Sequence, residues 1–157
     1  MSFILKFVRQ AIGDVLVQTG FSIPVNGVDT PVTVKRDPPS GLWLNDSQLP
    51  GLMIFVRGDR VSTTSMRRKR REITVDLILQ AKGPHDVLDQ IDDMHLEIEN
   101  RLMDSGNLSG TVFDLQPEGS EVHLERGEVV LGARRVTWRV RVDYAPRDPY
   151  LPAPATD

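Results

Sequence analysis

The sequence predicts an α+β fold, in which a mainly antiparallel sheet carries an N-terminal helix and a central amphipathic helix packed on one face. Residues 72–81 alternate apolar and polar side chains, as a strand with one buried side does. Residues 85–103 then repeat apolar side chains at helical spacing. Residues 135–144 alternate again and add a long strand late in the chain. A helix with one apolar stripe needs a sheet to cover, and these strands supply one.

The central strand and helix are joined by a tight turn at Lys82–Gly83–Pro84, because glycine turns easily and proline cannot donate to a sheet ladder. Acidic side chains fill the helix positions between the apolar ones. The apolar positions are Val87, Ile91, Met94, Ile98 and Leu102. Residues 105–110, Ser-Gly-Asn-Leu-Ser-Gly, favour turns and end the helix.

The first part of the chain is predicted to contain one helix and several short strands. Residues 2–18 have helical apolar spacing, and Asn26–Gly27 favours the turn of a short hairpin. Residues 32–35 fit an edge strand. Residues 52–56 form a compact apolar run, typical of a strand buried on both faces. Residues 57–66 are expected to be a polar excursion that joins two strands.

Beyond the central helix the pattern is again that of strands. Residues 111–115 predict a short strand, 117–119 a turn, and 121–125 a further strand or an extended connection. The Pro-rich end cannot continue a sheet. We therefore expect one domain over residues 1–146, followed by a Pro-rich tail over 147–157.

Composition limits the classes of function. A chain of 157 residues with a net charge of −3 fits one domain with a substantial core. It has no cysteine, which excludes disulfides and thiolate metal sites. No apolar run approaches the roughly 20 residues that span a bilayer. Because the first residues lack the pattern of a secretory signal, we expect assembly in the cytoplasm and no membrane partner.

No pattern in the sequence predicts catalysis or a cofactor. A Gly-rich phosphate loop, a nucleophile elbow and an HExxH helix are all missing from the sequence. The histidines, His85, His95 and His123, are spaced poorly for a shared metal and are expected to be solvated. The acidic residues of the central helix fit a solvated face better than an acid–base pair, which needs a buried carboxyl. The sequence therefore predicts a protein that is not an enzyme.

The densest local feature is a basic run just before the central strand. Its cationic residues are Arg67, Arg68, Lys69, Arg70 and Arg71. These side chains are compatible with contacts to nucleic-acid phosphates or with an acidic protein surface. They also suit a solvated strand entrance that discourages aggregation. The run has no interleaved aromatic residues to stack on bases.

A second basic feature lies on one side of the last strand and suggests self-association. We hypothesise that this row pairs with the acidic helix face of a neighbouring copy, because the two patches are complementary in charge. The basic side of this subunit interface would be Arg135, Arg139 and Arg141, and the acidic side Asp89, Asp93 and Glu97.

The order of these patterns resembles the tail terminator (tail completion) proteins of long-tailed bacteriophages. The resemblance covers nearly all of the chain apart from the Pro-rich tail. It depends on an N-terminal helix, Leu49–Pro50 before a buried strand, the alternation in 71–81, the helix 86–102, the turn 104–110 and the closing strand 136–144. The basic run and the tail are not part of it.

The resemblance implies a structural virion protein that forms a homo-oligomeric, hexameric ring at the head-proximal end of the tail. Such a ring caps the tail tube protein, stops tube growth and presents a surface to the head connector and neck proteins. Viral DNA would pass through its lumen. A head–tail joining protein is the nearest alternative. A small nucleic-acid-binding regulator that uses the basic run of residues 66–71 is the alternative from another class.

Overall fold

The computed structural model describes residues 4–37, 44–65, 68–84, 86–110, 112, 114–126 and 129–144. This part of the chain contains four helical elements and seven strands. The helical elements are α1 (Ile4–Val17), the short 3₁₀ helix η1 (Asp46–Gln48), α2 (Val87–Met103) and α3 (Gly106–Gly110). The strands are β1 (Ser22–Val25), β2 (Val28–Pro31), β3 (Thr33–Lys35), β4 (Gly51–Ser65), β5 (Arg68–Gly83), β6 (Asp114–Arg126) and β7 (Val130–Tyr144).

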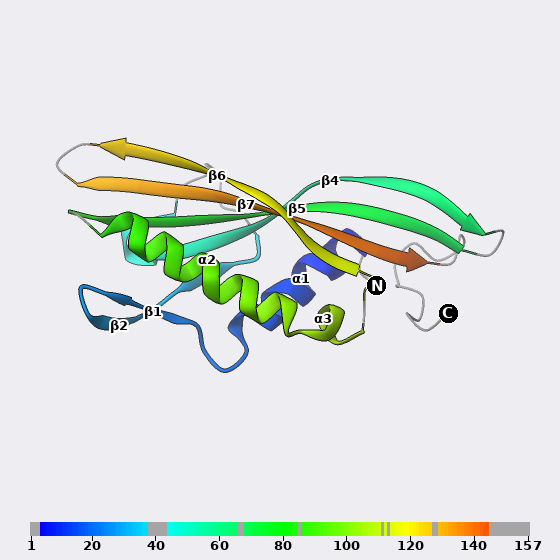
Figure 1. Cartoon of the computed structure of the whole chain (residues 1–157), viewed down its shortest axis with the longest axis horizontal. Coiled ribbons are helices and arrows are strands. Elements are labelled where there is room, and N and C mark those ends of the chain that lie inside the picture. Colours follow the sequence, from blue (N-terminus) through cyan, green and yellow to red (C-terminus); the bar gives the residue numbers. More distant parts are fainter. Residues whose placement is uncertain are drawn as a thin grey trace.

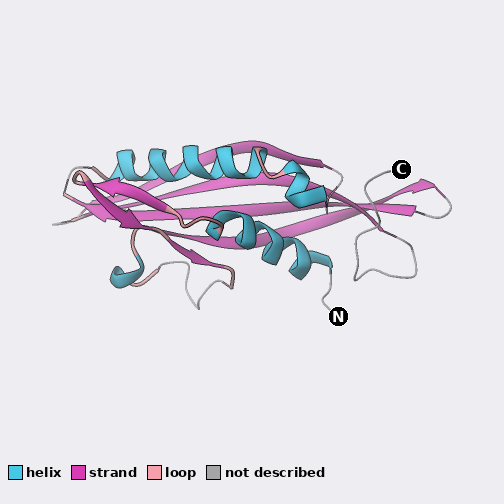
Figure 2. Cartoon of the chain, turned by 90° about the horizontal axis from the view of Figure 1, so that it is seen from below, coloured by secondary structure: helices cyan, strands magenta, loops and turns pink. Residues whose placement is uncertain are grey.

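Five of the strands form one twisted sheet in the order β3-β4-β5-β7-β6. All neighbours in this sheet are antiparallel except β3 and β4, which pair in parallel. β1 and β2 form a separate hairpin around the Asn26–Gly27 turn. Both long helices lie on one face of the sheet (Figures 1 and 2). The predicted α+β fold, with its mainly antiparallel sheet and two helices, is therefore confirmed.

The hydrophobic core lies between the helices and this face of the sheet, with Trp138 fully buried. α2 contributes the apolar stripe that the sequence predicts, and each member of the stripe is at most 3% exposed. Gly132 on β7 lets α2 approach closely. A Cβ atom there would clash with Val87 and lie 3.0 Å from Ile91 Cδ1. The core includes residues of α1, α2 and the strands, and no helix in the described ranges is long and apolar enough to cross a membrane.

Residues 57–65 differ from the prediction, because they continue β4 instead of forming a polar excursion. Asp59 to Thr63 pair residue by residue with β5, as in Val61 opposite Arg71. Two β-bulges interrupt the pairing of this strand. The segment shows no apolar alternation because it runs past the helices, as the free end of the β4–β5 hairpin in Figure 1 shows. Met66 lies outside the described residues.

The turn expected at residues 117–119 is also wrong, because β6 continues through it. Pro117 lies opposite Trp138 and Gly119 opposite Thr137, with a β-bulge between them. Proline is tolerated here because β6 is an edge strand, whose outer N–H groups have no partner to lose. The strand expected at 111–115 begins at Asp114, and the Pro-rich tail of residues 147–157 lies outside the described residues.

Candidate assembly surfaces

The sheet face opposite the helices is covered by ion pairs between neighbouring strands. This is the face that carries the arginine row predicted on the last strand. The pairs of that row are Arg135–Glu121 at 2.5 Å, Arg139–Glu118 at 3.4 Å, Arg141–Glu72 at 3.3 Å and Arg141–Asp114 at 3.2 Å. Carboxylates of the same chain therefore already neutralise the row, which is not the free positive surface that the interface hypothesis assumed.

Asp76 lies at the centre of this face and is only 3% exposed. Arg57 Nε lies 3.2 Å from Asp76 Oδ2, and Thr137 Oγ1 donates a hydrogen bond of 2.8 Å to Asp76 Oδ1. Both carboxylate oxygens are thus engaged by neighbouring strands. A buried carboxylate held in this way stabilises the pairing of the strands.

The acidic residues predicted for the interface lie on α2, on the opposite side of the sheet from the arginine row (Figure 1). Asp89 is exposed and Asp93 is half-buried, and neither forms an ion pair within the described part of the chain. Glu97 is different, because its Oε1 atom accepts a hydrogen bond of 2.7 Å from Arg101. The structure therefore leaves Asp89 and Asp93 as the accessible acids of the predicted set.

The basic run becomes the first residues of β5, and Arg67 lies outside the described residues. Arg70 Nε donates to Asp143 Oδ1 at 2.8 Å, and this hydrogen bond raises the pKa of Arg70 above its ordinary value. Arg71 pairs with Asp59. Arg68 and Lys69 are half-buried.

Successive residues of this run point to opposite faces of the sheet, so its cations do not form one continuous patch. Arg71 lies on the helix side, where its guanidinium stacks 5.2 Å from the ring centroid of Tyr144. The described residues therefore offer less free positive charge than the sequence suggests. Binding to nucleic acid or to a protein partner through this run stays a prediction.

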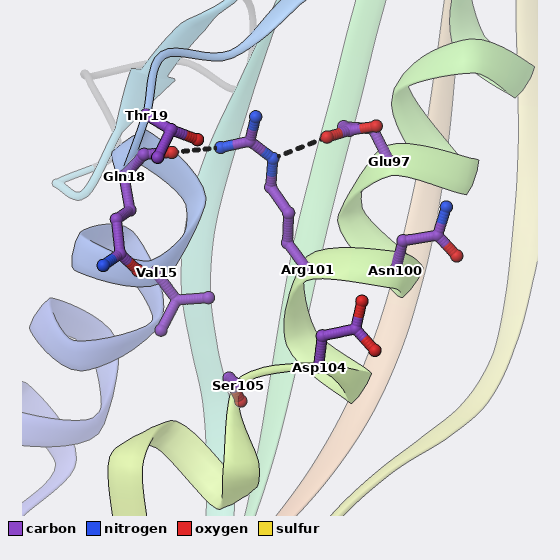
Figure 3. A pocket seen from close by; sticks show the side chains of 8 residues that line it. All are labelled: Val15, Gln18, Thr19, Glu97, Asn100, Arg101, Asp104 and Ser105. Atoms are coloured by element: carbon purple, nitrogen blue, oxygen red, sulfur yellow. Dashed lines mark hydrogen bonds and ion pairs between the residues drawn. The ribbon is translucent and has the colours of Figure 1, made fainter.

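Arg101 is a structural residue that the sequence analysis missed. It reaches from α2 to the end of α1, where it donates to the carbonyl oxygen of Leu16 at 3.0 Å. A second hydrogen bond, of 2.6 Å, goes to the carbonyl oxygen of Gln18 (Figure 3). It also donates to Gly20 O and lies 5.0 Å above the Phe21 ring. Helix C-termini leave unpaired carbonyls, which a cation satisfies. The only signal in the sequence was one arginine near the end of an otherwise acidic helix.

The surface depression beside Arg101, also lined by Glu97, Asn100 and Asp104, has a volume of about 410 Å³. It is open to solvent, and the Arg101 side chain donates four hydrogen bonds, three to backbone carbonyls and one to Glu97. This arrangement holds two helices together.

The histidines lie apart in the structure. His95 on α2 contacts Arg134, whose Nη1 atom lies 3.2 Å from His95 Nδ1 and 2.7 Å from Asp92 Oδ1. Burial and the nearby Arg134 lower the pKa of His95. His123 lies on β6 beside Glu125, and His85 is outside the described residues. Within the described ranges, no group of three histidine or acidic side chains is arranged to hold a metal ion.

Comparison with known proteins gives no family for this chain. No protein-family model matches it, and a search of curated proteins finds no significant match. The resemblance to tail terminators therefore rests on the residues quoted above, and its functional implications are proposals.

Proposed function

We propose that this chain is a structural virion protein, a tail terminator that forms a ring on the tail tube of a long-tailed bacteriophage. The observation that carries the proposal is the order of its elements. An N-terminal helix, a buried strand after Leu49–Pro50, the β5–α2 unit and the long closing strand β7 occur in the order on which the resemblance depends.

The polar side chains support a role in binding and assembly. The charged groups on the outer face of the sheet are paired with one another across strands, and Asp76 is held by Arg57 and Thr137. α2 carries three large apolar side chains that are about half exposed or more, namely Leu88, Leu96 and Met103. Exposed apolar side chains on one helix face are typical of a surface that a partner covers.

The mechanism follows from geometry. Identical contacts between two different surfaces of a subunit close into a ring when each contact adds a fixed rotation. A ring on the end of the tail tube blocks the addition of further tube subunits and offers its opposite side to the head connector. DNA passes through the lumen, and no bond is made or broken.

The test is to mix the purified chain with tail-tube subunits and to examine the products by light scattering and electron microscopy. We expect closed rings, and tubes that stop growing with a ring at one end. A chain that stays monomeric and leaves tube length unchanged would overturn the proposal. Rings that bind the head connector but not the tube would indicate a head–tail joining protein. A monomer that binds DNA tightly, with affinity lost when residues 67–71 become alanine, would indicate a regulator.

A further inference from the structure

The last residues of the sequence carry a motif that the proposed function does not use. Pro146, Pro149 and Pro152 recur at every third residue, and Tyr150 and Leu151 lie between the last two prolines. A polyproline II helix has three residues per turn, so this spacing places the three prolines on one side of such a helix. We call residues 146–152 the proline motif. Segments of this kind bind in grooves lined by aromatic and apolar side chains.

A groove of matching character lies between α1 and α3. It has a volume of about 480 Å³. Its apolar lining consists of Phe7, Ala11 and Val15 on α1 and Leu108 on α3. The three residues of α1 are only half-buried, so part of their apolar surface faces solvent in the groove. An apolar groove of this size is typical of a site that a ligand or a peptide segment fills.

The rim of the groove supplies hydrogen-bond donors. Gln10 and Gln18 line it, and their side-chain amide nitrogens donate no hydrogen bond within the described ranges of the chain. Gln10 Oε1 accepts a hydrogen bond of 3.2 Å from Arg36, which orients this amide group. A polyproline II segment makes no internal hydrogen bonds, so its carbonyl groups are free to accept hydrogen bonds from such donors.

The proline motif begins near enough to reach the groove of its own chain. β7 ends at Tyr144, in the half of the molecule that contains α3 (Figure 1). Tyr144 and Leu108 belong to the same core cluster. Residues 145–152 span about 25 Å as polyproline II. This reach exceeds the length of α1, whose 14 residues extend over about 21 Å.

We propose that the proline motif binds in the groove between α1 and α3 of its own chain. Tyr150 and Leu151 pack against the apolar lining, and the two glutamine amides donate to backbone carbonyls of the motif. Attachment to β7 gives the motif a high effective concentration at this groove, which favours it over the same segment of another copy. The contact does not require a ring and thus goes beyond the proposed function.

Cleavage of the full chain by trypsin after Arg147 measures how often the motif leaves the groove, because a protease cuts the released segment. The motif variant is Tyr150→Ala with Leu151→Ala, and it should be cut at least about tenfold faster, since it loses the burial of large apolar side chains. The control is Thr156→Ala with Asp157→Ala, which lies beyond the motif and should be cut at the rate of the unaltered chain.

Two groove variants repeat this test without altering the segment that trypsin cuts. Ala11→Glu places a charge in the apolar lining and should also raise the cleavage rate at least about tenfold. Gln10→Ala with Gln18→Ala removes the two donors at the rim, where the fold tolerates alanine, and should raise the rate at least about threefold. Circular dichroism checks that each variant is folded.

Disulfide trapping distinguishes the groove of the same chain from that of another copy, because the sequence contains no cysteine. Asp14→Cys, at the groove, is combined with Ala153→Cys, next to the proline motif. Oxidation should join the two cysteines within one chain, which runs as a monomer on a non-reducing gel. The matched control pairs Ala153→Cys with Val28→Cys, on the β1–β2 hairpin at the opposite end of the molecule (Figure 1), and should form little disulfide.

Faster cleavage of the motif and groove variants, together with a disulfide within one chain, would support the contact. Cleavage rates that stay unchanged in the motif variant and in folded groove variants would overturn it. Disulfides that join only different chains would also overturn it and would show that copies exchange the motif. None of these measurements depends on ring formation, so the contact and the proposed function can fail separately.

Discussion

Replacing Arg101 by methionine removes the hydrogen bonds from α2 to the carbonyls of Leu16, Gln18 and Gly20 at the end of α1. Removing a charged donor from carbonyl groups at a helix end lowers the free energy of unfolding, unless water reaches those carbonyl groups. We expect the free energy of unfolding to fall by about 2–3 kcal/mol. Urea denaturation measures this change.

A matched control is Arg135→Met, which removes a single ion pair with Glu121 on the exposed face of the sheet. Exposed pairs of this kind contribute less than about 1 kcal/mol. Equal losses in the two variants would contradict the role that we assign to Arg101.

His95 makes stability depend on pH. Burial and Arg134 lower its pKa in the folded chain, so the unfolded chain takes up the proton first as the pH falls. The free energy of unfolding should therefore decrease as the pH drops below the ordinary histidine pKa of about 6.5, until the lowered pKa is passed. His95→Gln should remove this part of the dependence. Denaturant midpoints between about pH 7 and pH 5 measure it, and an unchanged slope in the variant would contradict the assignment.

Residue roles were the least predictable part of the candidate site. The sequence identified Asp89 and Asp93 as acids on the solvated side of a helix, and the structure leaves Asp89 exposed and Asp93 half-buried on α2. It did not identify the partners of Arg139 and Arg141, because these depend on which residues of β5 and β6 lie opposite β7. Strand alternation gives the face of a side chain but not its neighbour across the sheet.

At the scale of the element, α3 is a left-handed turn at the end of α2. Asn107, Leu108 and Ser109 all have positive φ, at 56°, 54° and 62°. Left-handed backbone costs roughly 1–2 kcal/mol for a residue with a Cβ atom, and glycine escapes this cost. Leu108 is held there by burial, and Ser105 Oγ accepts a hydrogen bond of 3.0 Å from Leu108 N.

Ser109→Gly should therefore stabilise the chain, by about 0.5–1 kcal/mol after the entropy that glycine adds to the unfolded state. Thermal unfolding followed by circular dichroism measures the shift. Ser120→Gly, in the regular part of β6, is the control and should lower stability slightly. A fall in both variants would contradict the strain that we assign to α3.

Helices with a clear apolar period and the hairpin with an Asn–Gly turn were predictable, and the strand over residues 57–65 was not. α1, α2 and the β1–β2 hairpin lie where the residue patterns placed them. Residues 57–65 became a strand because β5 offers backbone partners along their length, although their own sequence lacks the alternation of a half-buried strand. Val61, Thr63 and Thr64 are β-branched, which was the one local signal for a strand there.

At the scale of the whole molecule, ring formation should depend on salt, because the subunit surface carries many charged side chains. Charge pairs at a subunit boundary are screened over about 10 Å at 0.1 M salt and about 3 Å at 1 M. We expect the fraction of chains in rings, measured by light scattering, to fall as salt rises over this range. Assembly that strengthens with salt would indicate a mainly apolar contact instead.

The ion pairs on the outer face of the sheet also govern how β5 and β7 find their alignment during folding. On the helix side, a slip of two residues would still place aliphatic side chains opposite one another, such as Ile73 and Val142. On the outer side, Arg70 lies opposite Asp143, and Glu72 lies opposite Arg141. A slip in one direction would bring Asp143 to Glu72, and a slip in the other would bring Arg141 to Arg70. Repulsion between like charges thus disfavours the two slipped registers of β5 and β7, which hydrophobic packing alone does not exclude.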